Sequence, residues 1–373
     1  MKKNEKRKPI VIATPLYPPD IGGPATYAKH LADALSRRDI PVRTVSFSSV
    51  RRFPKGLSHA IYFFRVLRAA FGARIIYALD PTSVGVPSRV AAALSAKPFF
   101  VRIAGDRAWE TEYADPALVK AHFRDPLSFR PRSFRARILG LFQTVVARSA
   151  RRVIVPSGYV KKIVVRWGVR EERIAVVEND IAPLPEKAAR VPAACAHARR
   201  PLVVSAGRMV PWKGFDTLLD ALSLMKERAP FAIIAGDGPE MGALREKARD
   251  LGIARNVCFP GALSREDLSS LLRASDIFIL ASGYEGFSHQ ILEAFSVGVP
   301  VVASAVGGNE ELVTREETGI LVPYGDALSL SRAMEYLFRN PKVAAEMARK
   351  GREKSAAYTS GRMVKETLNI LGI

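Results

Sequence analysis

The chain has 373 residues, of which 48% are apolar and 25% are charged, so it has room for two globular domains that each bury a core. These proportions exclude a disordered or disulfide-dense chain, and the two cysteines, Cys195 and Cys258, are predicted to be unpaired. No apolar run reaches the ~18 residues of a membrane span, so a cytoplasmic protein is expected.

The net charge of +21 is unevenly distributed. Residues 1–173 hold 33 Lys and Arg against 12 Asp and Glu, whereas the rest of the chain holds 24 of each. A basic half favours an anionic partner, which can be a nucleic acid, an anionic membrane face or a phosphate-bearing substrate. The inner face of the cell membrane is therefore a second expected location.

In the first half, apolar runs alternate with amphipathic segments, which predicts parallel strands joined by helices. The expected strands are Ile10–Thr14, Ile75–Leu79, Phe99–Ile103, Val153–Val155 and Ile174–Val177, and the expected helices are Ala25–Ser36, Leu57–Phe71, Ser88–Leu94 and a segment ending at Trp167. Gly22 and Gly23 lie between the first strand and the first helix, where glycines let the backbone approach an anion.

Two stretches of the first half combine basic and apolar side chains. Residues 57–71 predict either a helix at a membrane interface or a core helix with exposed Arg65 and Arg68, and the core helix is preferred. Residues 112–142 are predicted to be irregular, and their arginines suit a lipid surface, a phosphorylated acceptor, a nucleic acid or simply solvent.

Residues 183–200, rich in Pro, Ala and Arg, are predicted to be a linker. The expected domains are therefore 1–182 and 201–355, with a C-terminal helix over 356–373 that packs back on the first domain. The second half repeats the alternation. Its expected strands are Leu202–Ala206, Phe231–Ala235, Val257–Gly261, Ile277–Leu280, Val299–Ala303 and 318–322, and its helices include Phe215–Leu224, Ser264–Ala274 and Leu328–Ser355.

Two cations, Arg208 and Lys213, lie in the loop that follows the first strand of the second half. Next to the N-terminus of a helix they can neutralise a departing diphosphate, although isolated cations are more often solvated. No Asp-x-Asp pair occurs in the chain, so no metal is expected and these two cations would replace it.

Two carboxylates, Glu285 and Glu293, flank the expected N-terminus of a helix that begins near Ser288. Free backbone N–H groups at that terminus would bind a diphosphate, while each carboxylate accepts hydrogen bonds from hydroxyl groups. A molecule with a sugar, a diphosphate and a second sugar in this order is a nucleotide sugar. The alternative is that both glutamates are ordinary solvated charges.

The stretch Glu285-Gly-Phe-Ser-His-Gln-Ile-Leu-Glu293-Ala…Gly-Val-Pro-Val-Val resembles the E-x7-E motif of family-four glycosyltransferases, which have the GT-B fold. The Gly207-Arg208…Lys213-Gly214 and Pro18-Pro19…Gly22-Gly23 loops resemble two further motifs of that family. The resemblance covers nearly the whole chain. It implies an α/β protein with two Rossmann-like parallel-sheet domains that face each other across a cleft.

The resemblance also implies roles for particular residues. Glu285 would contact the donor hexose, Glu293 the ribose, Arg208 and Lys213 the diphosphate, and Gly22 and Gly23 would close the site. The remaining predicted donor contacts are Gly261, Leu263, Gly286, Phe287 and Ser288.

Gly105 stands where many relatives have a histidine, so Asp106 is the candidate polar group of the active site, unless it simply pairs with Arg107. The predicted catalytic residues are then Asp106, Glu285, Arg208 and Lys213. No metal and no other cofactor are expected.

The expected function is that of a retaining, metal-independent hexosyltransferase. It would move a hexose-type sugar from a nucleotide diphosphate sugar to a membrane-associated, polysaccharide or lipid-linked acceptor, and would associate peripherally with an anionic membrane face. A non-catalytic nucleotide-sugar-binding GT-B protein is the first alternative. A basic nucleic-acid-binding protein is the second, and it is disfavoured because the chain has no helix-turn-helix, zinc or RNA-sheet signature.

Overall fold

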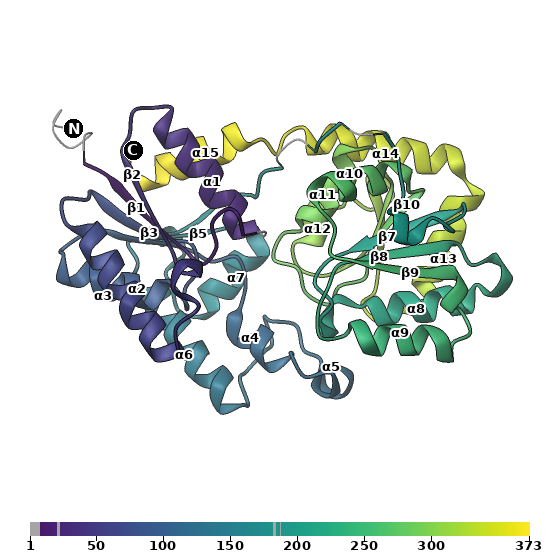
Figure 1. Cartoon of the computed structure of the whole chain (residues 1–373), viewed down its shortest axis with the longest axis horizontal. Coiled ribbons are helices and arrows are strands. Elements are labelled where there is room, and N and C mark those ends of the chain that lie inside the picture. Colours follow the sequence, from purple (N-terminus) through teal and green to yellow (C-terminus); the bar gives the residue numbers. More distant parts are fainter. Residues whose placement is uncertain (1–7, 21–22, 182–183, 187) are drawn as a thin grey trace. The chain divides into compact units, whose positions relative to one another are not determined.

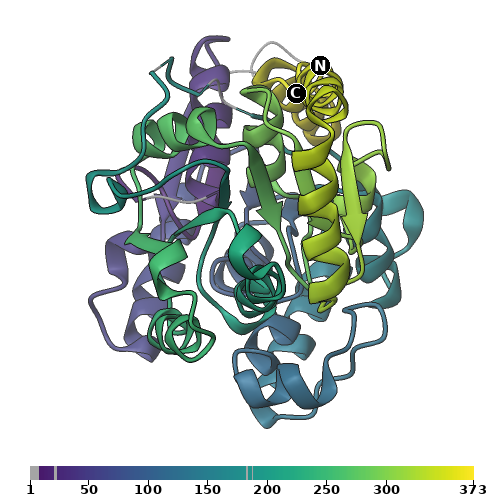
Figure 2. The ribbon, with the colours of Figure 1, turned by 90° about the vertical axis from the view of Figure 1, so that its right-hand side faces the viewer.

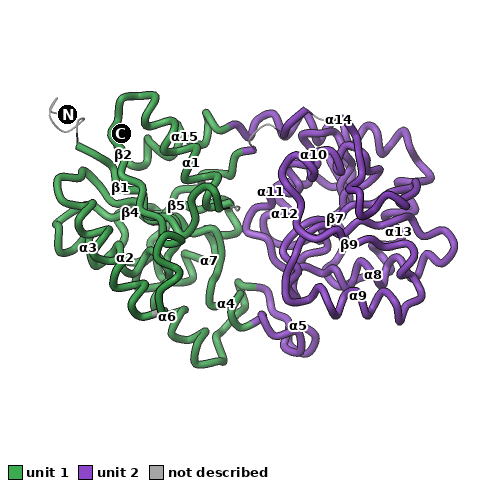
Figure 3. The backbone as a smooth tube through the Cα atoms, in the orientation of Figure 1, with its two compact units in different colours: residues 1–112, 126–180, 360–373 green, residues 113–125, 181–359 purple. Residues whose placement is uncertain are grey.

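The computed structural model describes residues 8–20, 23–181, 184–186 and 188–373, and the chain divides into two compact units (Figure 3). Unit 1 comprises Met1–Glu112, Pro126–Asp180 and Ser360–Ile373, and unit 2 comprises Tyr113–Asp125 and Ile181–Thr359. Each unit is built around one parallel sheet of six strands.

The sheet of unit 1 has the strand order β2-β1-β3-β4-β5-β6, and all its pairs are parallel. Strand β1, the second strand in this order, is buried along its whole length, because helices cover both faces of the sheet. The strands are β1 (Ile10–Thr14), β2 (Val42–Ser46), β3 (Ile75–Ala78), β4 (Phe99–Arg102), β5 (Arg152–Val155) and β6 (Ile174–Val176).

The helices of unit 1 form two layers, one on each face of this sheet (Figure 1). On one face α1 (Gly23–Ser36) packs against the C-terminal helix α15 (Ser360–Leu371), and their apolar sides form a core with β1 and β3. The opposite face is covered by α2 (Lys55–Ala70), α3 (Gly85–Leu94), α6 (Phe134–Ser149) and α7 (Gly158–Arg166), and α4 (Arg107–Glu112) packs on α6. In the described ranges, no helix is long and apolar enough to cross a membrane.

The sheet of unit 2 has the strand order β12-β11-β10-β7-β8-β9 and is also parallel throughout. Strands β7, β8 and β10 are buried along their whole length, as expected for runs of apolar residues between two helical layers. The strands are β7 (Leu202–Ala206), β8 (Phe231–Ala235), β9 (Val257–Gly261), β10 (Ile277–Leu280), β11 (Val301–Ser304) and β12 (Gly319–Val322).

Helices lie on both faces of this second sheet (Figures 1 and 2). One layer contains α8 (Phe215–Leu224), α9 (Met241–Asp250) and α13 (Ala327–Arg339), and the other contains α10 (Arg265–Ala274), α11 (His289–Ser296), α12 (Asn309–Leu312) and α14 (Pro341–Ser355). Unit 2 also holds α5 (Pro116–His122). Single 3-10 turns are η1 (Ser48–Val50), η2 (Glu171–Arg173), η3 (Ala193–Cys195), η4 (Pro211–Lys213), η5 (Lys226–Arg228) and η6 (Ala254–Asn256).

The structure corrects the sequence prediction in three segments. Residues 112–142 are not irregular: they contain α5 and the start of α6, which Ser133 caps by accepting a hydrogen bond from the backbone N–H of Ala136. Strand β2 was not predicted, because its side chains are only partly buried and therefore lack a continuous apolar run. The single helix expected over Leu328–Ser355 is broken before Pro341, where proline starts the first turn of α14.

The domain boundaries also differ from the predicted ones. Tyr113–Asp125 leaves the predicted first domain and belongs to unit 2. The described residues of the predicted linker 183–200 belong to unit 2, where Leu184 and Cys195 are buried in the core. The chain returns to unit 1 at Ser360, four residues later than the predicted 356.

The prediction that the two cysteines are unpaired is wrong. Cys195 and Cys258 form a disulfide with a Cα–Cα distance of 5.8 Å, although 63 positions separate them in the sequence. Cys195 ends η3, which packs on the edge strand β9, and Cys258 is the second residue of that strand. Tertiary packing of the linker brings the two sulfurs together, which spacing along the sequence does not reveal.

Candidate functional site

The candidate site lies in unit 2, at the edge of the sheet where the parallel strands end. Loops that follow β7, β8, β9, β10 and β11 meet there, and this edge is where open parallel sheets bind ligands. Most of the residues predicted to bind the donor lie in these loops. Among the described residues, no three His, Cys, Asp or Glu side chains are grouped as metal ligands.

The loop after β7 is fixed to the loop after β8 by backbone contacts. The N–H of Met209 donates to the carbonyl of Asp237 at 2.8 Å, and the N–H of Glu240 donates to the carbonyl of Met209 at 3.1 Å. Gly236 has φ +141°, and a Cβ there would lie 1.8 Å from the carbonyl oxygen of Gly207. Only glycine permits this approach, so the two loops form one rigid edge.

The loop after β7 is also fixed to the loop after β10. Gly214, with φ +66°, precedes α8, and a Cβ at this position would lie 2.0 Å from the carbonyl oxygen of Ala281. The N–H of Gly283 donates to the carbonyl of Trp212 at 2.7 Å. The backbone around Lys213 is therefore held in place from two sides.

This arrangement brings together two of the predicted catalytic residues. The Nζ of Lys213 lies 2.5 Å from Oε1 of Glu285, and their side chains are only 15% and 10% exposed. The amide Nε2 of Gln290 and the Cε of Lys213 both lie about 4 Å from the point where Gly207 would carry a Cβ. Gln290, near the start of α11, is a polar neighbour of the pair that the sequence analysis missed, because Gln has no distinctive spacing there.

Arg208 differs from Lys213 in its surroundings. Its side chain is exposed, and its guanidinium carbon lies 5.8 Å from the ring centroid of Trp212. The salt bridges within the described ranges do not include Arg208. The cation is thus oriented by an aromatic ring and has its charge available for an anion.

Glu293 lies on α11, the helix that Ser288 caps by accepting from the N–H of Ile291 at 3.3 Å. Burial raises the pKa of Glu293 to about 7, and the nearby Arg265 opposes this rise. The carboxyl group therefore changes its charge near neutral pH. In either state it offers oxygen atoms to a hydroxyl group.

Gly286, Phe287 and Ser288 lie between the two glutamates, and the side chains of Phe287 and Ser288 make contacts within the fold. Phe287 is buried and its ring centroid lies 5.7 Å from that of Tyr358, while the hydroxyl of Ser288 is the helix cap. The N–H of Gly308 donates to the carbonyl of Glu285 at 2.9 Å. A ligand here would therefore meet the backbone of this segment rather than the two side chains.

Gly261 and Leu263 follow the edge strand β9. The carbonyl of Gly261 accepts from the N–H of Gly236 at 2.8 Å, and a Cβ on Gly261 would meet nothing within 4 Å. Leu263 is partly buried and packs against the core of unit 2. The end of β9 is thus hydrogen-bonded to the loop after β8, and there is open space beside Gly261.

The α5 segment is a second feature that the sequence analysis missed. Helix α5 packs against η4, which contains Lys213, and the ring centroid of Phe123 lies 4.5 Å from that of Tyr324. Both rings would lie within 3 Å of a Cβ on Gly283. A segment from the first half of the chain therefore covers the loop after β10, and nothing in its own sequence indicated that position.

Asp106 lies in unit 1 and is engaged by its neighbours. Its Oδ1 accepts from the N–H of Trp109 at 3.0 Å and from Nε2 of Gln143 at 2.8 Å, while Arg107 pairs with Glu110. The side chain is 3% exposed, and burial raises its pKa. Asp106 thus holds the start of α4 against α6.

A pocket of about 350 Å³ in unit 1 is lined in part by Asp106 and Gln143. Two cationic side chains, Arg137 and Arg166, line it together with apolar groups such as Phe129. The Oε1 atom of Gln143 is buried and lacks a hydrogen-bond partner in the described part of the chain. The pocket therefore combines apolar walls with positive charge and one unused acceptor.

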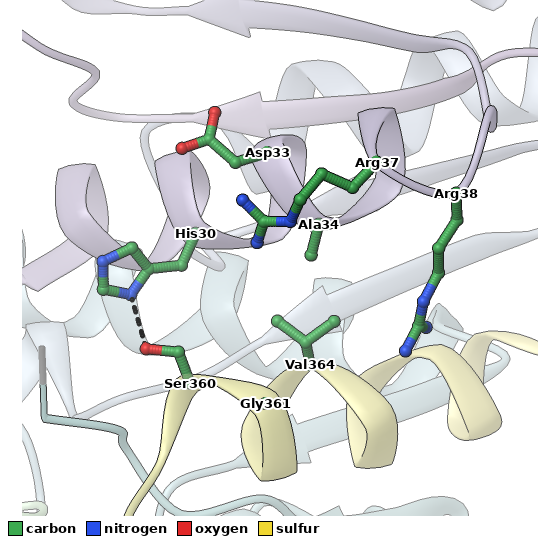
Figure 4. A pocket seen from close by; sticks show the side chains of 8 residues that line it. All are labelled: His30, Asp33, Ala34, Arg37, Arg38, Ser360, Gly361 and Val364. Atoms are coloured by element: carbon green, nitrogen blue, oxygen red, sulfur yellow. Dashed lines mark hydrogen bonds between the residues drawn. The ribbon is translucent and has the colours of Figure 1, made fainter.

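The remaining predicted residues are Gly22 and Gly23. Gly22 lies outside the described residues, and Gly23 is the first residue of α1. A second pocket of unit 1, about 290 Å³ in volume, lies between α1 and α15 (Figure 4). There the hydroxyl of Ser360 and Nδ1 of His30 are 3.5 Å apart, and both contact the buried Asp180. None of the predicted site residues lines this pocket.

Two family models match the chain. Residues 195–354 match the model "Glycosyl transferases group 1", and residues 22–180 match the "Glycosyl transferase 4-like domain". Apart from Tyr113–Asp125, which belongs to unit 2, the first range lies in unit 2 and the second in unit 1.

Similar proteins agree with these models. A lipopolysaccharide core biosynthesis glycosyltransferase, LpsE of Rhizobium meliloti, is 33% identical over 42% of this chain and 45% of its own length. A GDP-mannose-dependent alpha-(1-6)-phosphatidylinositol monomannoside mannosyltransferase of Mycolicibacterium smegmatis is 35% identical over 47% of this chain and 49% of its own length. The matched region thus spans about half the length of these curated relatives.

Solved structures share the fold of the whole chain. Anabaena HepE in complex with UDP-glucose has a TM-score of 0.75 at 20% identity, over 98% of this chain and 99% of that one. Sucrose-phosphate synthase from Thermosynechococcus elongatus has a TM-score of 0.77 at 19% identity, over 98% of both chains. These likenesses concern the fold alone.

Proposed function

Because this chain belongs to the group 1 glycosyl transferases and has the GT-B fold, we propose that it is a retaining hexosyltransferase that uses a nucleotide diphosphate sugar. Unit 2 would bind the donor. Unit 1 would bind the acceptor, an anionic or lipid-linked glycan. The names of relatives that act in lipopolysaccharide core synthesis and on a phosphatidylinositol mannoside support this acceptor class.

The observation that carries the proposal is the pair Lys213–Glu285 beside the exposed Arg208. These three charged side chains lie on loops that are held together by backbone hydrogen bonds and close backbone contacts. The loops therefore need to rearrange little when a substrate binds. The negatively charged diphosphate would bind to the positive side chains of Arg208 and Lys213. Glu285, already in contact with Lys213, would then accept hydrogen bonds from the hexose hydroxyls.

In the proposed reaction the bond between the anomeric carbon and the donor phosphate oxygen breaks, and its electron pair stays on the diphosphate. The acceptor hydroxyl oxygen forms the new bond to the anomeric carbon from the same face. Its proton passes to an oxygen of the leaving phosphate. Arg208 and Lys213 stabilise the negative charge that develops on the diphosphate. Loss of a single well-placed donor of this kind lowers the catalytic rate by about 10²–10³-fold.

Glu293 would bind the ribose of the donor. Its pKa of about 7 means that the ionised form, which accepts from two hydroxyl groups, becomes dominant only above neutral pH. Nucleotide affinity should therefore rise between pH 6 and pH 8. No metal is assigned to the reaction, and we expect the rate to be unchanged by a chelator.

Asp106 would act as a positioning residue on the acceptor side. Its contacts to α4 and Gln143 fix one wall of the pocket that also holds Arg137 and Arg166. These two arginines suit a phosphate group of the acceptor. An acceptor of this kind, carried by a lipid, would be reached by peripheral association with the inner face of the cell membrane.

A thermal-shift screen tests the donor site. UDP, GDP, ADP and their sugar conjugates are added to the wild type, to Glu293→Ala and to the exposed control Glu227→Ala. A ligand at 100 times its Kd stabilises by about 2.7 kcal/mol, and this gain should persist in the control and vanish in Glu293→Ala. If none of the nucleotides stabilises the wild type, the proposed donor site is wrong.

Product formation separates this proposal from a non-catalytic sugar-binding protein, which the glycine at position 105 keeps as the second candidate. The stabilising nucleotide sugar is incubated with the enzyme and with lipid-linked glycan acceptors. Release of the nucleoside diphosphate, with retained anomeric configuration in the product, supports a retaining transferase. Binding without any turnover, either to acceptor or to water, supports the second candidate.

A further inference from the structure

Three neighbouring helices of unit 1, α2, α3 and α6, expose apolar side chains on the side that faces away from the sheet. Phe134 is 78% exposed, Leu94 is 66% exposed and Phe64 is 64% exposed. We call the set the apolar face. Its members are Leu57, Phe64 and Phe71 on and just after α2, Val90 and Leu94 on α3, and Phe134, Ile138, Leu141, Phe142 and Val145 on α6.

The spacing of these residues places the exposed apolar side chains in a row along one outer side of each helix. Leu57, Phe64 and Phe71 follow each other at intervals of seven, which places them on one side of α2. The opposite side of the same helix packs inward through Tyr62 and Val66. Each helix thus has one apolar side for the core and a second one that the core does not use.

Helix α6 shows the same two-sided pattern. Phe134, Ile138, Leu141 and Val145 lie at intervals of three and four and are all exposed, whereas Gln143, Val146 and Ala147 are buried. Ordinary surface helices present polar side chains outward, so this second stripe is unexplained by folding.

The stripes lie on one surface. Helix α2 packs against α3, and α3 packs against α6, on the side of the sheet opposite α1 and α15 (Figure 1). In the described ranges, twelve exposed large apolar side chains belong to unit 1 and three to unit 2. Ten of the twelve are members of the apolar face.

The charges on the same helices are all of one sign. None of α2, α3 and α6 contains an Asp or a Glu. The exposed arginines among the apolar side chains are Arg65 and Arg68 on α2, and Arg135, Arg137 and Arg148 on α6. The salt bridges of the described residues include none of these five, so their charge is not neutralised by the fold.

Apolar side chains interspersed with arginines, without carboxylates, fit the boundary between the acyl chains and the phosphate groups of a bilayer. Nucleic acid would use the arginines but would leave the phenylalanines and leucines in water. We propose that the apolar face docks on the surface of an anionic lipid bilayer. The apolar side chains enter the headgroup region while the arginines bind lipid phosphates.

The test is flotation of the full-length protein with vesicles of phosphatidylcholine alone and with 30% phosphatidylglycerol. Wild type should bind the anionic vesicles at least tenfold more strongly than the neutral ones, and 0.5 M salt should weaken that binding. The variant Phe64→Ser/Phe134→Ser/Leu141→Ser should lose at least tenfold in partitioning.

The matched control changes three exposed apolar side chains of unit 2, in Leu224→Ser/Leu328→Ser/Tyr336→Ser. It should bind as the wild type does. Arg68→Gln/Arg135→Gln should weaken binding to anionic vesicles only, while Arg228→Gln/Lys342→Gln, with the same change in net charge, should not. Equal loss in both apolar triple variants would overturn the proposal.

A direct readout covers the case in which the triple variant does not fold. In Phe64→Trp the indole should be quenched by brominated lipids in anionic vesicles, whereas the indole of Leu328→Trp should not. Absence of quenching at position 64 overturns the proposal. So does a wild type that ignores vesicles but forms a dimer that the triple variant cannot form, because the face would then join two copies of the chain. The docking of this face rests on the peripheral membrane association in the proposed function and names the surface that makes it. The transfer reaction enters none of these measurements, so loss of vesicle binding contradicts the docking surface, whereas loss of sugar transfer contradicts the transferase assignment.

Discussion

The two units have the same kind of sheet and differ in where they place their chemistry. Unit 1 carries 33 Lys and Arg against 13 Asp and Glu, while unit 2 carries 24 against 23. Unit 1 exposes apolar stripes on one helical layer, whereas unit 2 concentrates glycines, an ion pair and a carboxyl group of raised pKa at its strand ends. One architecture thus supports either an exposed apolar surface on its helices or closely packed, charged loops at the edge of its sheet.

The largest expected effect is a loss of turnover on removal of one charge from the site of unit 2, with unit 1 unchanged. Lys213→Met keeps most of the side-chain volume but removes the charge that faces both Glu285 and the leaving diphosphate. We expect the turnover rate to fall about 100-fold or more. Lys342→Met, an exposed lysine of the same unit, is the control and should keep full activity. If the turnover rate of Lys213→Met equals that of the wild type, the edge of the unit 2 sheet has no catalytic role.

The next effect tests whether the edge of unit 2 depends on close backbone packing. Gly214→Ala forces a side chain into a left-handed conformation and 2.0 Å from the carbonyl oxygen of Ala281, so a loss of at least about 3 kcal/mol of unfolding free energy is expected. Gly242→Ala on α9 meets nothing within 4 Å and should be neutral or stabilise slightly. Urea denaturation measures both. Similar values for the two variants would contradict the packing argument.

Removal of the disulfide should affect unit 2 alone. The Cys195–Cys258 bond closes a loop of about 60 residues, and loss of such a loop constraint costs about 2–4 kcal/mol. Hydrogen exchange of Cys195→Ser/Cys258→Ser should be faster in β9 and α10 and unchanged in β1 and β3. Faster exchange throughout both units would mean that they do not unfold separately.

The smallest expected effect is the pH dependence of Glu293. Its folded pKa of about 7 is higher than the ordinary 4.5, so the folded state holds an extra proton between these values and loses stability as pH rises from about 4.5 to 7. Glu293→Gln removes this cost, so its gain in stability over wild type should grow from zero at pH 4 to at most about 3 kcal/mol at pH 8. Glu227→Gln is the exposed control. A gain in Glu293→Gln that is the same at both pH values would contradict the assignment.

The family, the alternation of strands and helices and the order of the site motifs could be predicted from the sequence. Buried parallel strands are continuous apolar runs, and Ile277–Leu280 and Phe215–Leu224 were predicted with the bounds that the structure has. The start of a helix near Ser288 was predicted because helix ends depend on adjacent residues, and Ser288 does cap α11. The charge asymmetry, too, is a property of composition alone.

Contacts between distant segments were decided by tertiary structure. The disulfide, the covering of Gly283 by Phe123 and the contact of Lys213 with Glu285 join residues 63, 160 and 72 positions apart. No local pattern encodes such pairs, because they depend on which strands and loops become neighbours. The pKa of Glu293 belongs here as well, since burial causes it.

The apolar face shows the same division most clearly. Both apolar stripes of α6 are present in the sequence, but only the sheet decides which one is buried and which one remains exposed. The local sequence determines which residues form a helix, because propensity, capping and periodicity are short-range properties. The side of the helix that meets water is determined by the neighbours that pack against the other side, and these come from elsewhere in the chain.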